Sequence, residues 1–179
     1  QGVTPLYAAC YRNHSDIVRM LLSADGIDVN AASSIGTTPL IIACGRGYED
    51  VVQQLLAADG IDVNQSETDE VTSLMVACRH GSVNVVRMLL NVDGIDVNAV
   101  QKSQGLTSLY VACELNREDV VRELLAADTI DVNKASTPHH NTPLFVACRY
   151  GHTNVVHMLL NTNKVDVNFT TDFEASPLY

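Results

Sequence analysis

The stretch TPLYAAC, residues 4–10, decides the fold because close copies of it return along the whole chain. The copies TPLIIAC, TSLMVAC, TSLYVAC and TPLFVAC begin at Thr38, Thr72, Thr107 and Thr142, and SPLY begins another at Ser176. The steps between the six starts are 34, 34, 35, 35 and 34 residues. A fixed period of about 20 to 50 residues is typical of repeat proteins, so we predict a solenoid.

Each copy predicts two short helices. The threonine is a favoured helix N-cap, and a proline such as Pro5 suits the first helical position. Nine residues after the threonine come the residue types that best tolerate a left-handed helix end, namely Asn13, Gly47, Gly81, Asn116 and Gly151. A second helix follows, in which Ile17, Val18, Leu21 and Leu22 lie on one face at amphipathic spacing. We expect this helix to close at the glycine of each DG pair, at Gly26, Gly60 and Gly94.

Each copy ends in the tripeptide DVN, and its distance from the threonine never changes. The difference between 34 and 35 residues therefore falls in the segment after the asparagine, which has the β-branched, small polar and glycine residues of a hairpin-like connection. One unit alone buries too little apolar surface to offset the entropy lost in ordering it. The units are therefore predicted to stack on one another.

The TPL start, the small pair Ala9-Cys10, the Gly or Asn turn, the VV..LL helix and DVN together resemble the ankyrin-repeat family. The resemblance covers essentially all 179 residues and implies an all-α repeat solenoid, with helix-turn-helix units joined by β-hairpin-like loops. It implies a single array over 1–179, with repeats at about 1–34, 35–68, 69–103, 104–138 and 139–172 and a partial repeat at 173–179. Both ends fall inside a unit, so we expect the chain to be an excerpt of a longer array.

The sequence also departs from the family pattern. The family's usual histidine after TPL is replaced by Tyr7, Ile41, Met75, Tyr110, Phe145 and Tyr179. One extra residue also lies between LL and DVN. These departures bear on local loop geometry and not on the fold.

Composition restricts the classes of partner. The formal net charge is -10, from 11 Lys and Arg against 21 Asp and Glu, which disfavours binding to nucleic acid or to an anionic membrane surface. No apolar run approaches the roughly 18 residues of a membrane span, so no direct membrane insertion is expected. We expect a protein or peptide partner and a monomeric chain, unless the truncated ends associate.

One cysteine stands at the same position of every full copy, at Cys10, Cys44, Cys78, Cys113 and Cys148. An odd count at near-equal intervals fits a disulfide framework poorly and a reducing compartment better, so we expect an intracellular protein, cytoplasmic or nuclear. Helices packed about 8 to 10 Å apart hold such cysteines beyond the roughly 7 Å limit for a disulfide. We predict that the thiols are small buried packing groups.

No catalytic, metal or cofactor site is predicted. The histidines lack the paired ligand motifs that a zinc site normally requires. The sequence has neither a nucleophile elbow nor a Gly-rich phosphate loop. The protein is therefore not expected to be an enzyme.

The DVN asparagines allow two interpretations. Asparagine bonds nearby backbone and tolerates turns, which makes a structural role the main interpretation. The spacing L-x(5)-D-V-N is also similar to the site that asparaginyl hydroxylases of the hypoxia pathway modify in ankyrin repeats. The residues with this spacing are Asn30, Asn64, Asn98, Asn133 and Asn168.

The resemblance implies a partner-binding concave face, formed by the hairpin tips and the exposed part of each first helix. It maps this face onto the positions seven and eight after each threonine and onto the residues just before it. The candidates on the first helices are Tyr11, Arg12, Arg46, Arg79, His80, Leu115, Arg149 and Tyr150. Those on the loops are Ile35, Asp69, Gln104 and His139. These positions vary between repeats while the framework does not.

Four of the five repeats place an arginine on this face of an otherwise acidic protein. Because arginine binds carboxylates through two parallel hydrogen bonds and arginine and tyrosine are enriched at interface hot spots, we expect binding of an acidic or phosphorylated protein segment. The alternative for the arginines is a solvated face without a ligand. The alternative function is a structural spacer or scaffold segment of a larger multidomain protein.

Overall fold

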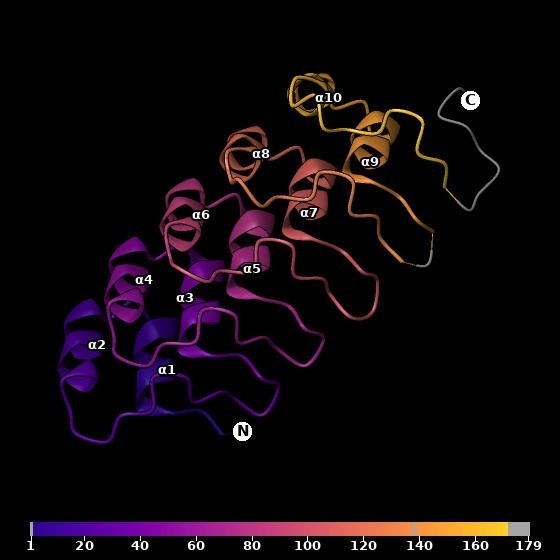
Figure 1. The fold of residues 1–179 in the computed structure, drawn as a ribbon. Coiled ribbons are helices and arrows are strands. Elements are labelled where there is room, and N and C mark those ends of the chain that lie inside the picture. The colour runs from indigo at the N-terminus through magenta and orange to yellow at the C-terminus, as the bar shows by residue number, and fades with distance from the viewer. Residues whose placement is uncertain (1, 138, 172–179) are drawn as a thin grey trace. The chain divides into compact units, whose positions relative to one another are not determined.

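Every repeat folds as a pair of short helices followed by an extended loop (Figure 1). The computed structural model describes residues 2–137 and 139–171, and the chain divides into two compact units, Gln1–Ile95 and Asp96–Tyr179. We call these the N-terminal unit and the C-terminal unit and describe each by itself. The partial repeat predicted at 173–179, with Ser176 and Tyr179, lies outside the described residues.

Ten helices and no strand are found within the described residues, which makes the fold an all-helical repeat solenoid as predicted. The N-terminal unit contains α1 (Pro5–Tyr11), α2 (Ser15–Leu22), α3 (Pro39–Arg46), α4 (Glu49–Leu56), α5 (Ser73–His80) and α6 (Val83–Leu90). The C-terminal unit contains α7 (Ser108–Glu114), α8 (Glu118–Leu125), α9 (Pro143–Arg149) and α10 (Thr153–Leu160). Within each unit the first helices pack on first helices and the second helices on second helices.

The predicted starts and ends of the first helices are confirmed. The Oγ1 atom of Thr4 accepts a hydrogen bond from the backbone N–H of Tyr7 at 3.1 Å, and the equivalent threonine of every described repeat does the same. The residues nine positions later are all left-handed, with φ of 57° at Asn13 and 69° at Gly47. Local sequence therefore determines where these helices begin and end.

The predicted end of the second helices is wrong. α2 ends at Leu22, and Gly26 lies four residues later in the tight turn from Ala24 to Ile27. α8 has Thr129 at the equivalent position and still ends at Leu125, so the glycine does not stop the helix. Its positive φ of 75° serves the turn instead.

Hairpin-like loops follow Asn30, Asn64, Asn98 and Asn133, as predicted, while most of the segment after Asn168 lies outside the described residues. The Ser33 N–H donates to the Thr37 carbonyl at 2.9 Å, and the Gln101 N–H to the Leu106 carbonyl at 2.9 Å. The first loop closes over four positions and the second over five, so the extra residue of the longer repeats lies at the hairpin tip. The described loops form only an isolated bridge, between Ser66 and Thr72.

The core of each unit is built from the same positions in every repeat. The leucine of TPL, the alanine and cysteine that follow, and the valine and leucine of the second helix are buried almost throughout. The prediction of buried thiols is confirmed for Cys10, Cys44, Cys78 and Cys113. It is wrong for Cys148, which is exposed. Cys44 lies beside Ser73 and Cys78 of the next repeat, whereas the segment that follows the repeat of Cys148 lies outside the described residues.

The apolar face predicted for the first of the second helices is only partly buried. Val18 is fully buried, but Ile17 is 47% exposed. The equivalent Val51 is 0% exposed because α4 packs against α2 of the preceding repeat. Among the described residues, α2 has no second helix of a preceding repeat packed against it, and Ile17 is left partly exposed.

Candidate partner-binding surface

The twelve predicted contact residues lie where the sequence places them, on helix ends and loop tips. Those on the first helices all fall in the last turn or at the C-cap of α1, α3, α5, α7 and α9. All are exposed except Asp69, which is half-buried. Cations are favoured at the C-terminal end of a helix, so the arginines also suit their local position without any ligand.

Three side chains of the first two repeats form what we call the Arg–Tyr cluster: Tyr11, Arg12 and Arg46. The Cζ atom of Arg46 lies 4.1 Å from the centroid of the Tyr11 ring, and that of Arg12 lies 5.7 Å from the same centroid. Both distances are within the range of a cation–π contact. Two positive charges from neighbouring repeats therefore meet at one aromatic ring that is itself 39% exposed.

Two further tyrosines support this cluster, and the sequence patterns did not single them out for this role. The ring of Tyr7 stacks against that of Tyr11, with 6.5 Å between centroids. Hydrogen bonding to Tyr11, and to a smaller extent to Tyr48, raises the pKa of Arg46. Burial raises the pKa of Tyr7, and the charge of nearby Glu67 raises it further, so an acidic side chain borders the cluster on its loop side.

The third repeat places Arg79 and His80 at the end of α5. The Nδ1 atom of His80 lies 2.9 Å from the carbonyl oxygen of Val76. In the second repeat, Gly45 occupies the position equivalent to Arg79, and a Cβ atom there would stand 2.7 Å from the Val76 Cγ1 atom. Position 45 varies between the repeats of this chain, which predicts a surface residue. The structure shows instead that close packing against Val76 restricts this position to a small residue.

The C-terminal unit presents a less charged surface. Leu115 is 42% exposed at the end of α7, and Tyr150 is 52% exposed at the end of α9. The Tyr150 ring stacks on His152 with 6.0 Å between centroids, and the Cζ atom of Arg149 lies 5.8 Å from its centroid. His152, whose Nε2 atom lies 3.0 Å from the Glu114 carbonyl oxygen, is a residue that the sequence did not indicate.

Neighbouring loop tips are joined through their backbones. The Thr68 N–H and hydroxyl both donate to the Ile35 carbonyl, at 3.3 and 2.7 Å, and the Thr137 N–H donates to the Gln104 carbonyl at 2.7 Å. The side chains of Ile35, Gln104 and His139 remain exposed. The loop tips therefore present exposed side chains on a backbone that hydrogen bonds to the neighbouring loop hold in place.

The DVN asparagines act as clamps between consecutive repeats, which agrees with their predicted structural role. The Nδ2 atom of Asn30 donates to the Gly60 carbonyl at 2.7 Å, and its Oδ1 atom accepts from the Asp62 N–H at 2.9 Å. Asn98 and Asn133 make the same pair of bonds. Hydroxylation of these asparagines stays a prediction.

The structure gives the thiols no activated environment. Burial raises the pKa of Cys10 to about 12, and it also raises the pKa of Cys44 and Cys113. A thiol with a raised pKa stays protonated near neutral pH and is a poor nucleophile and metal ligand. Across residues 2–137 and 139–171, no cluster of three His, Cys, Asp or Glu side chains could hold a metal ion.

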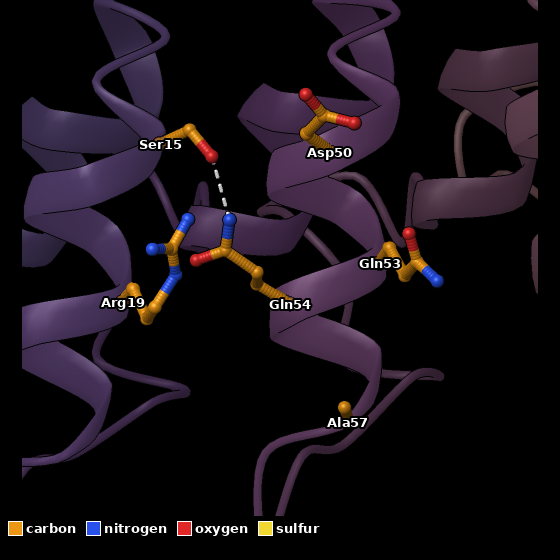
Figure 2. A pocket seen from close by; sticks show the side chains of 6 residues that line it. All are labelled: Ser15, Arg19, Asp50, Gln53, Gln54 and Ala57. Atoms are coloured by element: carbon orange, nitrogen blue, oxygen red, sulfur yellow. Dashed lines mark hydrogen bonds between the residues drawn. The ribbon is translucent and has the colours of Figure 1, made fainter.

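An open pocket of about 430 Å³ lies between α2 and α4, away from the predicted contact residues (Figure 2). The Nε2 atom of Gln54 donates to Ser15 Oγ at 2.6 Å across it. At the next junction, Glu49 and Asn84 stand at the positions equivalent to Ser15 and Asp50, and the Nδ2 atom of Asn84 donates to Glu49 Oε1 at 2.9 Å.

Stacked pairs of short helices with hairpin-like loops define the class of helical repeat proteins. The family model for ankyrin repeats matches residues 1–67, 32–101 and 60–136, and a single-repeat ankyrin model matches 139–169. The chain therefore belongs to the ankyrin-repeat family. A search of curated proteins found no match. Ankyrin repeats are generally non-catalytic modules for protein–protein interaction. None of the helices in the described ranges has the length and apolar character needed to cross a membrane.

Proposed function

We propose that this chain is a non-catalytic protein-interaction module that binds an acidic or phosphorylated segment of a partner protein. The segment lies along the ends of the first helices and the loop tips. The observation that carries the proposal is the Arg–Tyr cluster, where Arg12 and Arg46 both approach the ring of Tyr11. Like charges gathered at one place favour an anion that neutralises them.

The geometry of Arg46 suits this task. Its guanidinium stacks over the Tyr11 ring at 4.1 Å, which fixes its plane and reduces the rotamer freedom that binding would otherwise remove. A guanidinium carries five N–H donors, so the hydrogen bonds of Arg46 to Tyr11 and Tyr48 leave donors for an anion. A carboxylate or phosphate binds such an edge through two parallel hydrogen bonds.

A second candidate function is that of a spacer or scaffold. The observation that favours it is the Asn clamp, which joins consecutive repeats in the same way at Asn30, Asn98 and Asn133. Regular junctions of this kind give an array of defined length whatever its surface binds. In this case the arginines are solvated and no partner depends on them.

Binding of labelled peptides separates the two functions. The probes are an oligoglutamate peptide, a peptide with one phosphoserine, and an uncharged peptide of equal length, measured by fluorescence anisotropy. The test variant is Arg12→Gln with Arg46→Gln. The matched control is Arg19→Gln with Arg122→Gln, because these arginines carry the same charge but pair with Asp16 and Asp119 on second helices.

We expect the two anionic probes to bind the native chain and the uncharged one to bind weakly. The test variant should lose at least about tenfold in affinity, since a hydrogen bond to a charged group contributes roughly 1.5 to 3 kcal/mol. Its affinity should also depend less steeply on salt. Equal losses in the test and control variants would reject the cluster as the binding site and favour the scaffold function.

A further inference from the structure

An Asp-Gly pair recurs in the turn after the second helix of the first three repeats, at Asp25-Gly26, Asp59-Gly60 and Asp93-Gly94. None of these residues belongs to the binding surface proposed above. Asp-Gly is a chemically labile pair, because the backbone nitrogen of glycine can attack the aspartate carboxyl without hindrance from a side chain. Whether it reacts in a folded protein depends on how firmly the turn is held.

The three turns are exposed to solvent, and each is closed by a long hydrogen bond. The Ile27 N–H reaches the Ala24 carbonyl at 3.4 Å, which is beyond the usual length of an N–H···O hydrogen bond. Aspartate and glycine occupy the two central positions, with φ of 75° at Gly26, as a type II turn requires. Around each of the three glycines, no atom other than those of its chain neighbours lies within 4 Å of an added Cβ. Water therefore reaches these turns freely.

The aspartate carboxyl groups and the glycine N–H groups are also accessible for reaction. The aspartates of all three pairs are exposed. Within the part of the chain that the structure describes, the N–H groups of Gly26, Gly60 and Gly94 donate no hydrogen bond. The attacking nitrogen does not have to break a hydrogen bond before it moves.

In the second and third of these turns, an asparagine of the preceding repeat holds the carbonyl of the glycine. Asn30 Nδ2 donates to the Gly60 carbonyl at 2.7 Å, and Asn64 Nδ2 donates to the Gly94 carbonyl at 2.8 Å. Bringing the glycine nitrogen to the carboxyl carbon requires rotation about the Cα–C bond of the aspartate. A clamped glycine resists this rotation.

We infer that Asp25, Asp59 and Asp93 are sites of spontaneous aspartate isomerisation, and that Asn30 and Asn64 slow the reaction at Asp59 and Asp93 in the folded protein. The glycine nitrogen forms a bond to the carboxyl carbon of the protonated side chain and gives up its proton. The hydroxyl of that carboxyl leaves and departs with the proton as water, which closes a succinimide ring. Water then adds to either ring carbonyl, and the ring opens to aspartate or to isoaspartate. The water lost is regained, and nothing is oxidised or reduced.

The product changes the junction between repeats. Isoaspartate routes the main chain through Cβ and so lengthens it by one carbon. At position 59 this displaces the Gly60 carbonyl and the Asp62 N–H, the two groups that Asn30 holds. The Asn clamp is then lost.

The test is incubation of the intact chain near neutral pH, followed by digestion and electron-transfer fragmentation, which quantifies isoaspartate at each site. Asp128, in the equivalent turn, is the internal control because it precedes Thr129, whose branched side chain hinders attack. We expect isoaspartate to form at Asp25, Asp59 and Asp93, and Asp128 to react slowest. One net hydrogen bond changes an opening equilibrium about fivefold, which sets the effect expected of a clamp.

Two variants that each remove one Asn clamp test whether the clamp controls the rate of isomerisation. Asn30→Ala frees the Gly60 carbonyl and should raise the rate at Asp59 about fivefold while leaving Asp93 unchanged. Asn64→Ala should do the reverse. Circular dichroism before incubation establishes that each variant is folded, and a sample unfolded in guanidinium should show equal rates at the three sites.

Two results would overturn the inference. One is isoaspartate at Asp25, Asp59 and Asp93 that forms no faster than at Asp128. The other is a folded Asn30→Ala or Asn64→Ala variant that leaves the rate at its own aspartate unchanged. If one variant does not fold, the other variant and the comparison with Asp128 in the native chain still decide the outcome.

Discussion

Gly45 shows how a single residue links the candidate surface to the packing below it. The residue lies in α3, and its missing side chain leaves room for Val76 of α5. The other repeats carry Tyr11, Arg79, Glu114 or Arg149 at this position. Variation at this position therefore has two physical origins, a location at the surface in most repeats and close helix packing in one.

Gly45→Ala should destabilise the chain. Alanine is favoured over glycine within a helix by about 0.5 to 1 kcal/mol. The new Cβ would stand 2.7 Å from the Val76 Cγ1 atom, and overpacking of this kind costs about 1 to 3 kcal/mol. Packing outweighs propensity, so we expect a net loss of up to about 2 kcal/mol in urea unfolding.

The cause of that loss can be separated by a second substitution. Val76→Ala removes the Cγ1 atom, so the double variant Gly45→Ala with Val76→Ala should lose less stability than the two single changes added together. Arg79→Ala tests the same helix position in a repeat whose native residue already carries a Cβ atom. A Gly45→Ala variant at least as stable as the native chain would refute the packing argument.

At the scale of the element, the helix starts and the left-handed helix ends were predictable because a few neighbouring residues determine them. The end of the second helices was not, since glycine in a turn and glycine at a helix end give similar sequence signals. The exposure of Cys148 and of Ile17 depends on which repeats lie beside them. The Arg–Tyr cluster joins α1 to α3, so the sequence indicated its members but not their contact.

Thr107→Ala tests the cap that starts α7. The Thr107 Oγ1 atom accepts from the Tyr110 N–H at 3.1 Å, and the residue is 1% exposed. Ser108 follows it, so this helix lacks the first-turn proline that fixes the backbone in α1 and α3. We expect the change to cost about 1 kcal/mol, with a range of about 0.5 to 2, in urea unfolding.

Thr107→Ser is the matched control, because it keeps the accepting oxygen and removes only a methyl group. It should retain most of the stability that Thr107→Ala loses. Equal losses from the two substitutions would assign the role of Thr107 to packing of its methyl group and contradict the capping argument.

At the scale of the whole molecule, one feature recurs in both units, the buried thiol of the first helix. Burial raises the pKa of Cys10 to about 12, against an ordinary value near 9, and it raises the pKa of Cys44 and Cys113 as well. The folded chain therefore holds these groups as neutral thiols at a pH where the unfolded chain has released their protons. A carboxylate with a lowered pKa would make the chain less stable in acid, whereas raised thiol pKa values make it less stable in alkali.

The stability of the chain should accordingly be full below about pH 9 and fall as the pH rises from about 9 towards 12. Each affected thiol contributes a slope of about 1.4 kcal/mol per pH unit in that window, because the unfolded state binds fewer protons than the folded state. Urea unfolding at a series of pH values measures this slope. Cys10→Ala should make this slope shallower by about the contribution of one thiol. Cys148→Ala removes an exposed thiol whose pKa burial raises without reaching that of Cys10, so its effect should be confined to the lower part of the pH window. Equal slopes in the native chain and the Cys10→Ala variant would mean that other groups cause the alkaline loss of stability.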